Sequence, residues 1–237
     1  MQVRIYKSKQ LVAEKFSAFF KDSAEGTGEF HVALSGGSTP KIVFDYLATH
    51  FSKEIDWSKV FFYWGDERCV LPTDDESNYK MTVAHLLSKI AIPEANIYRI
   101  HGENEPKSEA ISYSNLLDQK LPQDLGMPKF DLVILGMGDD GHTASIFPHE
   151  IKLWEAQENC VVAIHPESGQ KRVSITGRII NNAEVVAFLV TGSSKAEKVK
   201  EIIKEEGSYL DYPATLVKPT SGKLLWFLDK EAAEGLY

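Results

Sequence analysis

The chain has 237 residues, of which 43% are hydrophobic and 25% are charged, a composition typical of a globular protein with a substantial core. Its formal charge of −8 comes without blocks of like charge, which argues against nucleic acid or a membrane surface as a partner. No segment approaches the run of about 18 apolar residues that would span a bilayer. Cys69 and Cys160 lack disulfide or zinc-site spacing, so we expect free thiols in a cytoplasmic protein.

Hydrophobic periodicity predicts helices and strands that alternate along the chain. In chain order they are helix 8–21, strand 31–35, helix 39–51, strand 59–64, helix 77–90, strand 96–100, helix 105–121, strands 130–136, 160–164, 172–176 and 185–192, helix 194–206 and strand 223–228.

Three of these strands, FDLVIL, VVAFLV and KLLWFL, are almost wholly apolar, as in strands buried on both faces of a parallel sheet. The fold class is therefore predicted to be α/β, with a doubly wound, mostly parallel sheet and helices on both faces. Without a linker or a repeat, residues 1–237 are expected to form a single domain, although residues 93–128 can be interpreted as a small insertion.

The first candidate site segment, SGGSTP (35–40), follows a predicted strand, where open α/β sheets bind ligands. Gly36 and Gly37 let the backbone approach a ligand, while Ser38 and Thr39 offer hydroxyl groups. The pattern predicts a helix N-terminus that binds an anion such as phosphate. The alternative is a capped turn without a ligand, and neither a GxGxxG nor a Walker pattern implies a nucleotide.

The second segment, WGDERCVLP (64–72), is predicted to be a loop after a strand. Asp66 stands here beside Arg68, which can bind a phosphate or a carboxylate through its planar fork of donors. Alternatively, Arg68 pairs with the neighbouring acids on the surface. Residues 77–79 follow an acidic run and are interpreted as a solvated loop and helix cap rather than as part of a site.

The third segment, GMGDDGHTASIFP (136–148), places glycines, aspartates and a histidine after a buried strand. Glycines such as Gly138 permit a tight turn, and a new helical stretch is expected over 143–147. A neutral imidazole at His142 suits general-base work, with Asp140 or Asp139 to orient it. The alternative is that the aspartates cap the turn and the histidine bonds a carbonyl.

Two cations complete the candidate set, Arg172 on a predicted strand and Lys195 at the start of a helix. Lys195 either adds charge to an anion site or decorates the surface. Metal-ligand spacing and a GxSxG nucleophile motif are both missing from the sequence, so neither a metal nor a serine nucleophile is expected. The residues together predict an enzyme that acts on a small phosphorylated metabolite by acid–base chemistry.

The ordered segments LSGGSTP, WGDERCVLPTDDESNY, DLVILGMGDDGHTASIFP, QKRVSIT, VTGSSKAEKV and YPATLVKPTSGKLLWFLD resemble the 6-phosphogluconolactonase family. This resemblance implies the fold that the family shares with glucosamine-6-phosphate deaminase. It also implies hydrolysis of 6-phospho-D-glucono-1,5-lactone to 6-phosphogluconate in the oxidative pentose phosphate pathway, without metal or organic cofactor. The expected partner is this small sugar-phosphate lactone, and the expected assembly is a monomer or a weak homo-oligomer.

The resemblance also implies roles for individual residues. His142 would activate a water molecule, Asp140 would orient His142, and Arg68 would contact either the phosphate or the developing oxyanion. The implied phosphate-binding residues are Gly36, Gly37, Ser38, Thr39, Arg172 and Lys195, and further substrate-side candidates are Asp66 and Gly138.

Three alternatives remain open at this point. The deaminase motif has an acid five residues after the histidine and a tyrosine in place of Arg68, whereas this chain has Phe147 and Arg68 there. Both departures favour the lactonase. A non-catalytic sugar-phosphate sensor would not need His142, and a scaffold protein would present a large exposed apolar patch.

Overall fold

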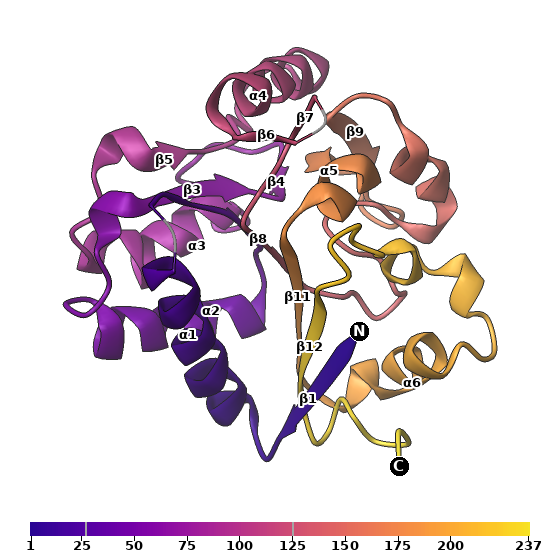
Figure 1. The fold of residues 1–237 in the computed structure, drawn as a ribbon. Helices are drawn as coiled ribbons and strands as arrows, with labels where there is room; N and C mark the ends of the chain where they lie inside the picture. Colours follow the sequence, from indigo (N-terminus) through magenta and orange to yellow (C-terminus); the bar gives the residue numbers. More distant parts are fainter. Residues whose placement is uncertain (27, 125) are drawn as a thin grey trace.

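A computed structural model describes residues 1–26, 28–124 and 126–237 (Figure 1). Thr27 and Leu125 lie outside the described residues, and the predictions for residues 1–237 and 93–128 include them. Within the described ranges, seven parallel strands form the central sheet in the order β1-β12-β11-β8-β2-β3-β5. They are β1 (Gln2–Tyr6), β2 (Phe30–Leu34), β3 (Val60–Trp64), β5 (Ile97–Tyr98), β8 (Leu132–Leu135), β11 (Val185–Val190) and β12 (Leu224–Asp229).

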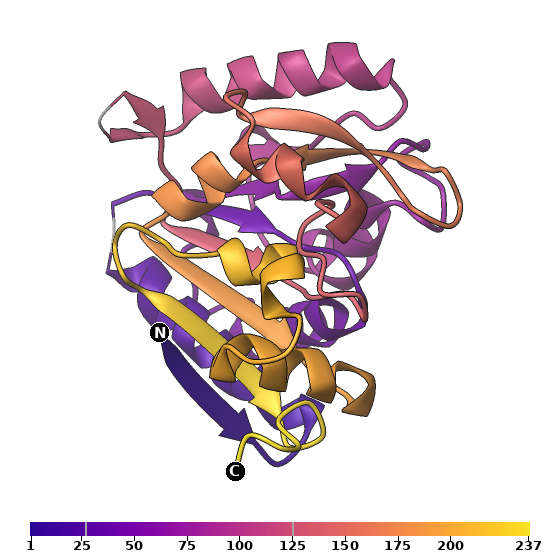
Figure 2. The ribbon, with the colours of Figure 1, turned by 90° about the vertical axis from the view of Figure 1, so that its right-hand side faces the viewer.

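Helices cover both faces of this sheet, as Figures 1 and 2 show. Those on one side are α1 (Lys9–Glu25) and α2 (Ser38–Tyr46), and those on the other side are α5 (Gly177–Asn182) and α6 (Ala196–Lys204). Successive β12 side chains point to opposite faces. Phe227 meets Phe16 of α1 with ring centroids 5.1 Å apart, whereas Trp226 stacks on Phe188 of β11 at 4.0 Å. The predicted doubly wound α/β fold class is confirmed.

A second, antiparallel sheet lies beside the first (Figure 1). It consists of β4 (Asp66–Arg68), β10 (Lys171–Ile175) and β9 (Cys160–Ile164), and α4 (Pro106–Lys120) packs on β9 and β10. Two shorter elements, β6 (Gln123–Asp124) and β7 (Met127–Pro128), pair with each other, and α3 (Asn78–His85) follows β4 in the chain.

The structure corrects two predictions near the candidate site. Residues 66–68, expected in a loop, form strand β4, whose three residues are too few to show a period. The expected helical stretch over 143–147 is wrong. Thr143 and Ile146 instead form an antiparallel bridge, and Ala144 has a positive φ of 48°, which breaks a right-handed helix. Helical geometry begins only with the 3-10 helix Pro148–Glu155.

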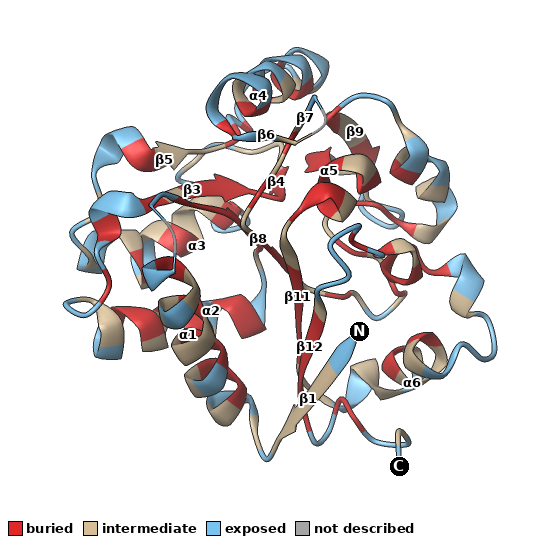
Figure 3. Ribbon diagram, viewed as in Figure 1, coloured by how far each residue is buried: buried red, intermediate tan, exposed pale blue. Residues whose placement is uncertain are grey.

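The core follows the central sheet, whose inner strands are buried almost throughout, whereas the edge strands β1 and β5 are not (Figure 3). Nearly all the buried apolar side chains form one cluster. The single-domain assignment of residues 1–237 stays a prediction. Cys69 and Cys160 are free thiols, as predicted. In the described ranges, no helix combines the length and the apolar character needed to cross a membrane.

Candidate functional site

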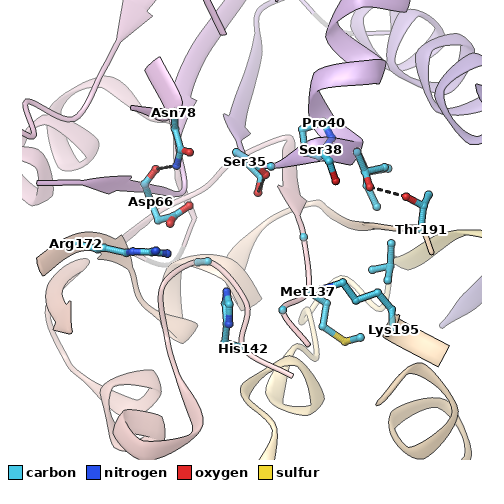
Figure 4. Close-up of a pocket in the computed structure, with 18 of the residues that line it drawn as sticks. Ser35, Ser38, Pro40, Asp66, Asn78, Met137, His142, Arg172, Thr191 and Lys195 are labelled. Carbon is cyan, nitrogen blue, oxygen red and sulfur yellow. Dashed lines mark hydrogen bonds between the residues drawn. The ribbon is translucent and has the colours of Figure 1, made fainter. Parts of the chain in front are cut away.

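A cavity of about 200 Å³ lies at the carboxyl ends of β2, β3, β8 and β11 (Figure 4). Strand order reverses between β2 and β8, and crevices of this kind bind ligands in open α/β sheets. Of the predicted site residues, those that line the cavity are Gly36, Gly37, Ser38, Thr39, Asp66, Arg68, Gly138, His142, Arg172 and Lys195. Asp140 does not line it but contacts His142 directly.

The N-terminus of α2 faces this cavity with unpaired backbone donors. Gly37 caps the helix at φ 106°, a conformation that favours glycine, and no side chain caps the first turn. The free N–H groups and the helix dipole therefore favour an anion there. Thr39 Oγ1 lies 2.8 Å from Thr191 Oγ1, so this loop is tied to the loop that follows β11.

Lys195 extends from that second loop into the same region. Its Nζ lies 2.5 Å from Asp139 Oδ1, and the hydrogen bond from Lys195 lowers the pKa of Asp139. Lys195 lines the cavity, and its amine is paired with the Asp139 carboxylate of the glycine-rich loop. The role of Lys195 in an anion site stays a prediction.

His142 is held by its neighbour Asp140 in the tight turn after β8. Its Nδ1 lies 2.6 Å from Asp140 Oδ1, and its backbone N–H donates to the same oxygen at 3.0 Å. Burial alone would raise the pKa of Asp140, but the hydrogen bonds from His142 outweigh it and lower that pKa to about 2. An ionised carboxylate can only accept, so His142 Nδ1 is the donor in this contact, and Nε2 is the nitrogen that would act as a base in a neutral imidazole.

Two glycines of this turn lie too close to neighbouring rings to carry a side chain. A Cβ at Gly138 would lie 2.2 Å from the His142 ring, and a Cβ at Gly141 would lie 2.6 Å from the ring of Tyr212. Gly141 also has a φ of 82°. The glycine content of the segment is therefore explained by the close approach of the chain to His142 and by the turn itself.

Phe147 is a fully buried side chain that packs against His142. Its ring centroid lies 4.6 Å from that of His142, and the guanidinium carbon of Arg172 lies 5.5 Å from the same centroid. The position that carries an acid in the deaminase motif is thus occupied here by the apolar ring of Phe147, which contacts both the His142 imidazole and the Arg172 guanidinium.

Arg68 and Arg172 stand directly opposite each other on β4 and β10. Burial, together with the neighbouring Arg68 charge, lowers the pKa of Arg172. Arg68 Nη1 donates to the carbonyl of Glu76, and its buried Nε has no partner. In the described ranges, neither guanidinium lies within ion-pair distance of a carboxylate, so the alternative in which Arg68 pairs with its neighbouring acids does not occur. Guanidiniums suit phosphates and carboxylates, and the substrate role of Arg68 and Arg172 stays a prediction.

Sequence reasoning missed Asn78, which lines the cavity although residues 77–79 were interpreted as a cap outside the site. The cap itself is real, since Ser77 Oγ accepts from the N–H of Lys80 at 3.1 Å. Buried Glu67 accepts from the backbone N–H groups of Arg68 and Asn78 and joins β4 to α3. Only this tertiary pairing brings Asn78 to the cavity, and no local pattern signals it.

Comparison with known proteins agrees with this geometry. A sequence model of the family described as glucosamine-6-phosphate isomerases/6-phosphogluconolactonase matches residues 7–226. The chain belongs to this family. A 6-phosphogluconolactonase of Treponema pallidum (strain Nichols) is 40% identical over 222 residues, which are 94% of this chain and 92% of the relative.

Two solved structures have the same fold as this chain. That of 6-phosphogluconolactonase from Trypanosoma brucei has a TM-score of 0.90 at 28% identity and covers 100% of this chain and 98% of its own. That of a monomeric glucosamine-6-phosphate deaminase has a TM-score of 0.83 at 19% identity over 98% and 99% of the two chains, and this likeness concerns the fold alone.

Proposed function

We propose that the protein hydrolyses 6-phospho-D-glucono-1,5-lactone to 6-phospho-D-gluconate. The observation that carries the proposal is one cavity lined by His142, which Asp140 holds from behind the wall, and by the open N-terminus of α2 and Lys195. A base and an anion site in one small cavity suit a substrate with a phosphate and an electrophilic carbon. The relative from Treponema pallidum, named a 6-phosphogluconolactonase, supports the choice of substrate.

In the proposed reaction, the phosphate binds the first turn of α2 and Lys195, which positions the lactone carbonyl near His142. His142 Nε2 takes a proton from water as the water oxygen attacks the carbonyl carbon. Ionised Asp140 stabilises the imidazolium that results. Collapse of the tetrahedral intermediate breaks the bond from the carbonyl carbon to the ring oxygen, and the imidazolium returns its proton to that oxygen.

The oxyanion of the intermediate needs donors that are already in place. Arg68 and Arg172 supply guanidinium N–H groups on the β4 and β10 side of the cavity, and Arg172 also remains available to the phosphate. None of these proposed steps requires a metal or an organic cofactor.

We further propose a place in the oxidative pentose phosphate pathway and a cytoplasmic location for the protein, as a monomer or a weak homo-oligomer. The free thiols of Cys69 and Cys160 support a reducing compartment, and burial raises the pKa of both, to about 11 for Cys69 and about 12 for Cys160.

The deaminase reaction is the main alternative and has less support. The deaminase motif has an acid five residues after the histidine, and here the fully buried Phe147 ring occupies that position at 4.6 Å from the His142 ring. A sugar-phosphate sensor would have no use for an imidazole oriented by an ionised carboxylate. We therefore retain lactone hydrolysis as the proposal.

Freshly prepared 6-phosphogluconolactone provides the test, with proton release measured above the spontaneous rate. The purified protein should accelerate hydrolysis, and it should release no ammonia from glucosamine 6-phosphate. A rate equal to the spontaneous one would contradict lactone hydrolysis, whereas ammonia release would favour the deaminase.

The same assay tests the base. His142→Gln should lower kcat by about 10²–10⁴-fold, the usual contribution of a positioned base, with little change in thermal stability. His149→Gln is the matched control, because His149 also contacts the Phe147 ring but does not line the cavity. A His142→Gln variant as active as the control would remove the base assignment.

A further inference from the structure

Asn78, the first residue of α3, is held by one backbone and one side-chain hydrogen bond. It is only 3% exposed, and it lines the cavity. Its backbone N–H donates to Glu67 Oε1 at 2.8 Å, and its Nδ2 donates to the carbonyl oxygen of Asp66 at 2.9 Å. That carbonyl can only accept, so the NH₂ end of the amide must face it. The direction of the opposite end, Oδ1, is therefore fixed (Figure 4).

This fixed Oδ1 is an acceptor without a donor, because no hydrogen bond to it is made by the residues in ranges 1–26, 28–124 and 126–237. It faces the loop after β2, where a Cβ on Gly36 would lie 1.9 Å from it. A glycine at this position leaves room for the amide, and both Gly36 and Asn78 line the cavity. An acceptor that receives no hydrogen bond from the protein is a group that a ligand donor can satisfy.

Most of the charged groups at the cavity wall are donors. Arg68, Arg172, Lys195 and the first turn of α2 suit a phosphate and an oxyanion. Asp66 also lines the cavity as an acceptor, and its Oδ2 already accepts a hydrogen bond from Ser145 Oγ. The hydroxyl groups of a sugar ring also need acceptors when they are desolvated. The lactone carries such hydroxyls at C2, C3 and C4.

We propose that Asn78 Oδ1 accepts a hydrogen bond from a ring hydroxyl of the substrate and thereby selects hydroxylated lactones over deoxy lactones. The inference rests on the proposed lactone hydrolysis for its substrate. It assigns Asn78 a direct contact with that substrate.

The test compares the kcat/KM values of two proteins on four substrates. Wild type and Asn78→Ala are assayed for kcat/KM on the parent lactone and on its 2-, 3- and 4-deoxy analogues. Wild type should reject one deoxy analogue by about 10- to 100-fold, the loss expected for one buried hydrogen bond. Asn78→Ala should process that analogue and the parent at nearly equal rates.

Ser77→Ala is the matched control, because Ser77 caps the same helix and does not line the cavity. It should change kcat/KM for all four lactones by a common factor and leave their ratios unchanged. Asn78→Ser serves as a shorter polar substitute if the alanine variant does not fold, and a wild type that accepts all three deoxy lactones equally overturns the proposal without any variant.

Binding gives a readout that does not depend on turnover. Glucose 6-phosphate and its 2-, 3- and 4-deoxy analogues carry ring hydroxyls at the same positions, and calorimetry gives their Kd. If the Kd values of these sugar phosphates differ in a way that depends on Asn78 but the protein does not hydrolyse the lactone, the proposed function is refuted and the Asn78 contact is supported. Equal discrimination by wild type and Asn78→Ala in both readouts overturns the contact.

Discussion

The two adjacent aspartates of the glycine-rich loop have different partners and therefore different effects. Asp139 holds Lys195, and Asp140 holds Nδ1 of His142. Sequence alone left both as candidates to orient the histidine, because neighbouring residues in an irregular turn can point either way. The geometry of the turn directs Asp139 toward Lys195 and Asp140 toward His142. One short segment therefore contacts both the predicted anion site and the imidazole.

The pKa of Asp140 predicts how its contribution to stability depends on pH. This pKa is about 2 in the fold, below the value of about 3.9 for an unperturbed aspartate. The stabilisation is thus present above about pH 4 and is lost as the pH falls toward about 2. Because the side chain is 40% exposed, solvent screening reduces the effect to the order of 1 kcal/mol.

Urea unfolding of wild type and Asp140→Asn from pH 7 to pH 2 measures this contribution. Wild type should be more stable near neutral pH, and the difference should shrink between about pH 4 and pH 2. In a His142→Gln background the difference should be smaller throughout, because the partner that lowers the pKa is absent. A difference that stays constant with pH would refute the linkage.

At the scale of elements, the site depends on how closely the loop after β2 approaches the start of α3. A Cβ on Gly36 would lie 1.9 Å from Asn78 Oδ1, and Asn78 is fixed by Asp66 and Glu67. The clash cannot be relieved by rotating the amide alone. Either the N-terminus of α2 or that of α3 must move.

Gly36→Ala should therefore lower kcat/KM by about 100-fold, since a displacement of about 1 Å can have that effect. Overpacking typically costs about 1–3 kcal/mol, which corresponds to a decrease in Tm of about 2–10 °C. Gly28→Ala is the control, because a Cβ there has no atom within 4 Å. Scanning calorimetry and the lactone assay together check both effects, and a fully active Gly36→Ala variant would contradict the close approach.

Sequence patterns located the elements that meet at the cavity, because buried apolar strands identify a parallel sheet and glycine-rich loops identify its carboxyl ends. They did not locate β4 or Asn78. Three residues are too few to show a period, and the hydrogen bonds from Asn78 and Arg68 to Glu67 form only after tertiary pairing. The expected helix over 143–147 was wrong because the positive φ of Ala144 is set by the turn around His142.

At the scale of the whole molecule, the net charge of the chain is negative, whereas three cationic side chains line the cavity. The chain carries a formal charge of −8, yet Lys195, Arg68 and Arg172 all line one cavity. An anionic substrate gains little from the long-range field, which salt screens over about 10 Å. Its affinity must arise from contacts inside the cavity, so an anion should stabilise the fold by binding there.

Inorganic phosphate should therefore raise the Tm of wild type beyond the effect of KCl at equal ionic strength. At ten times its Kd, a ligand adds about 1.4 kcal/mol of stability, which corresponds to an increase of about 3–6 °C. Lys195→Gln should lose most of this increase, because Lys195 lines the cavity and its positive charge is removed. Lys198→Gln should keep the increase, since Lys198 lies on α6 over the Tyr212 ring and does not line the cavity. Equal increases in wild type and Lys195→Gln would mean that phosphate stabilises the protein elsewhere and would contradict the anion site beside α2.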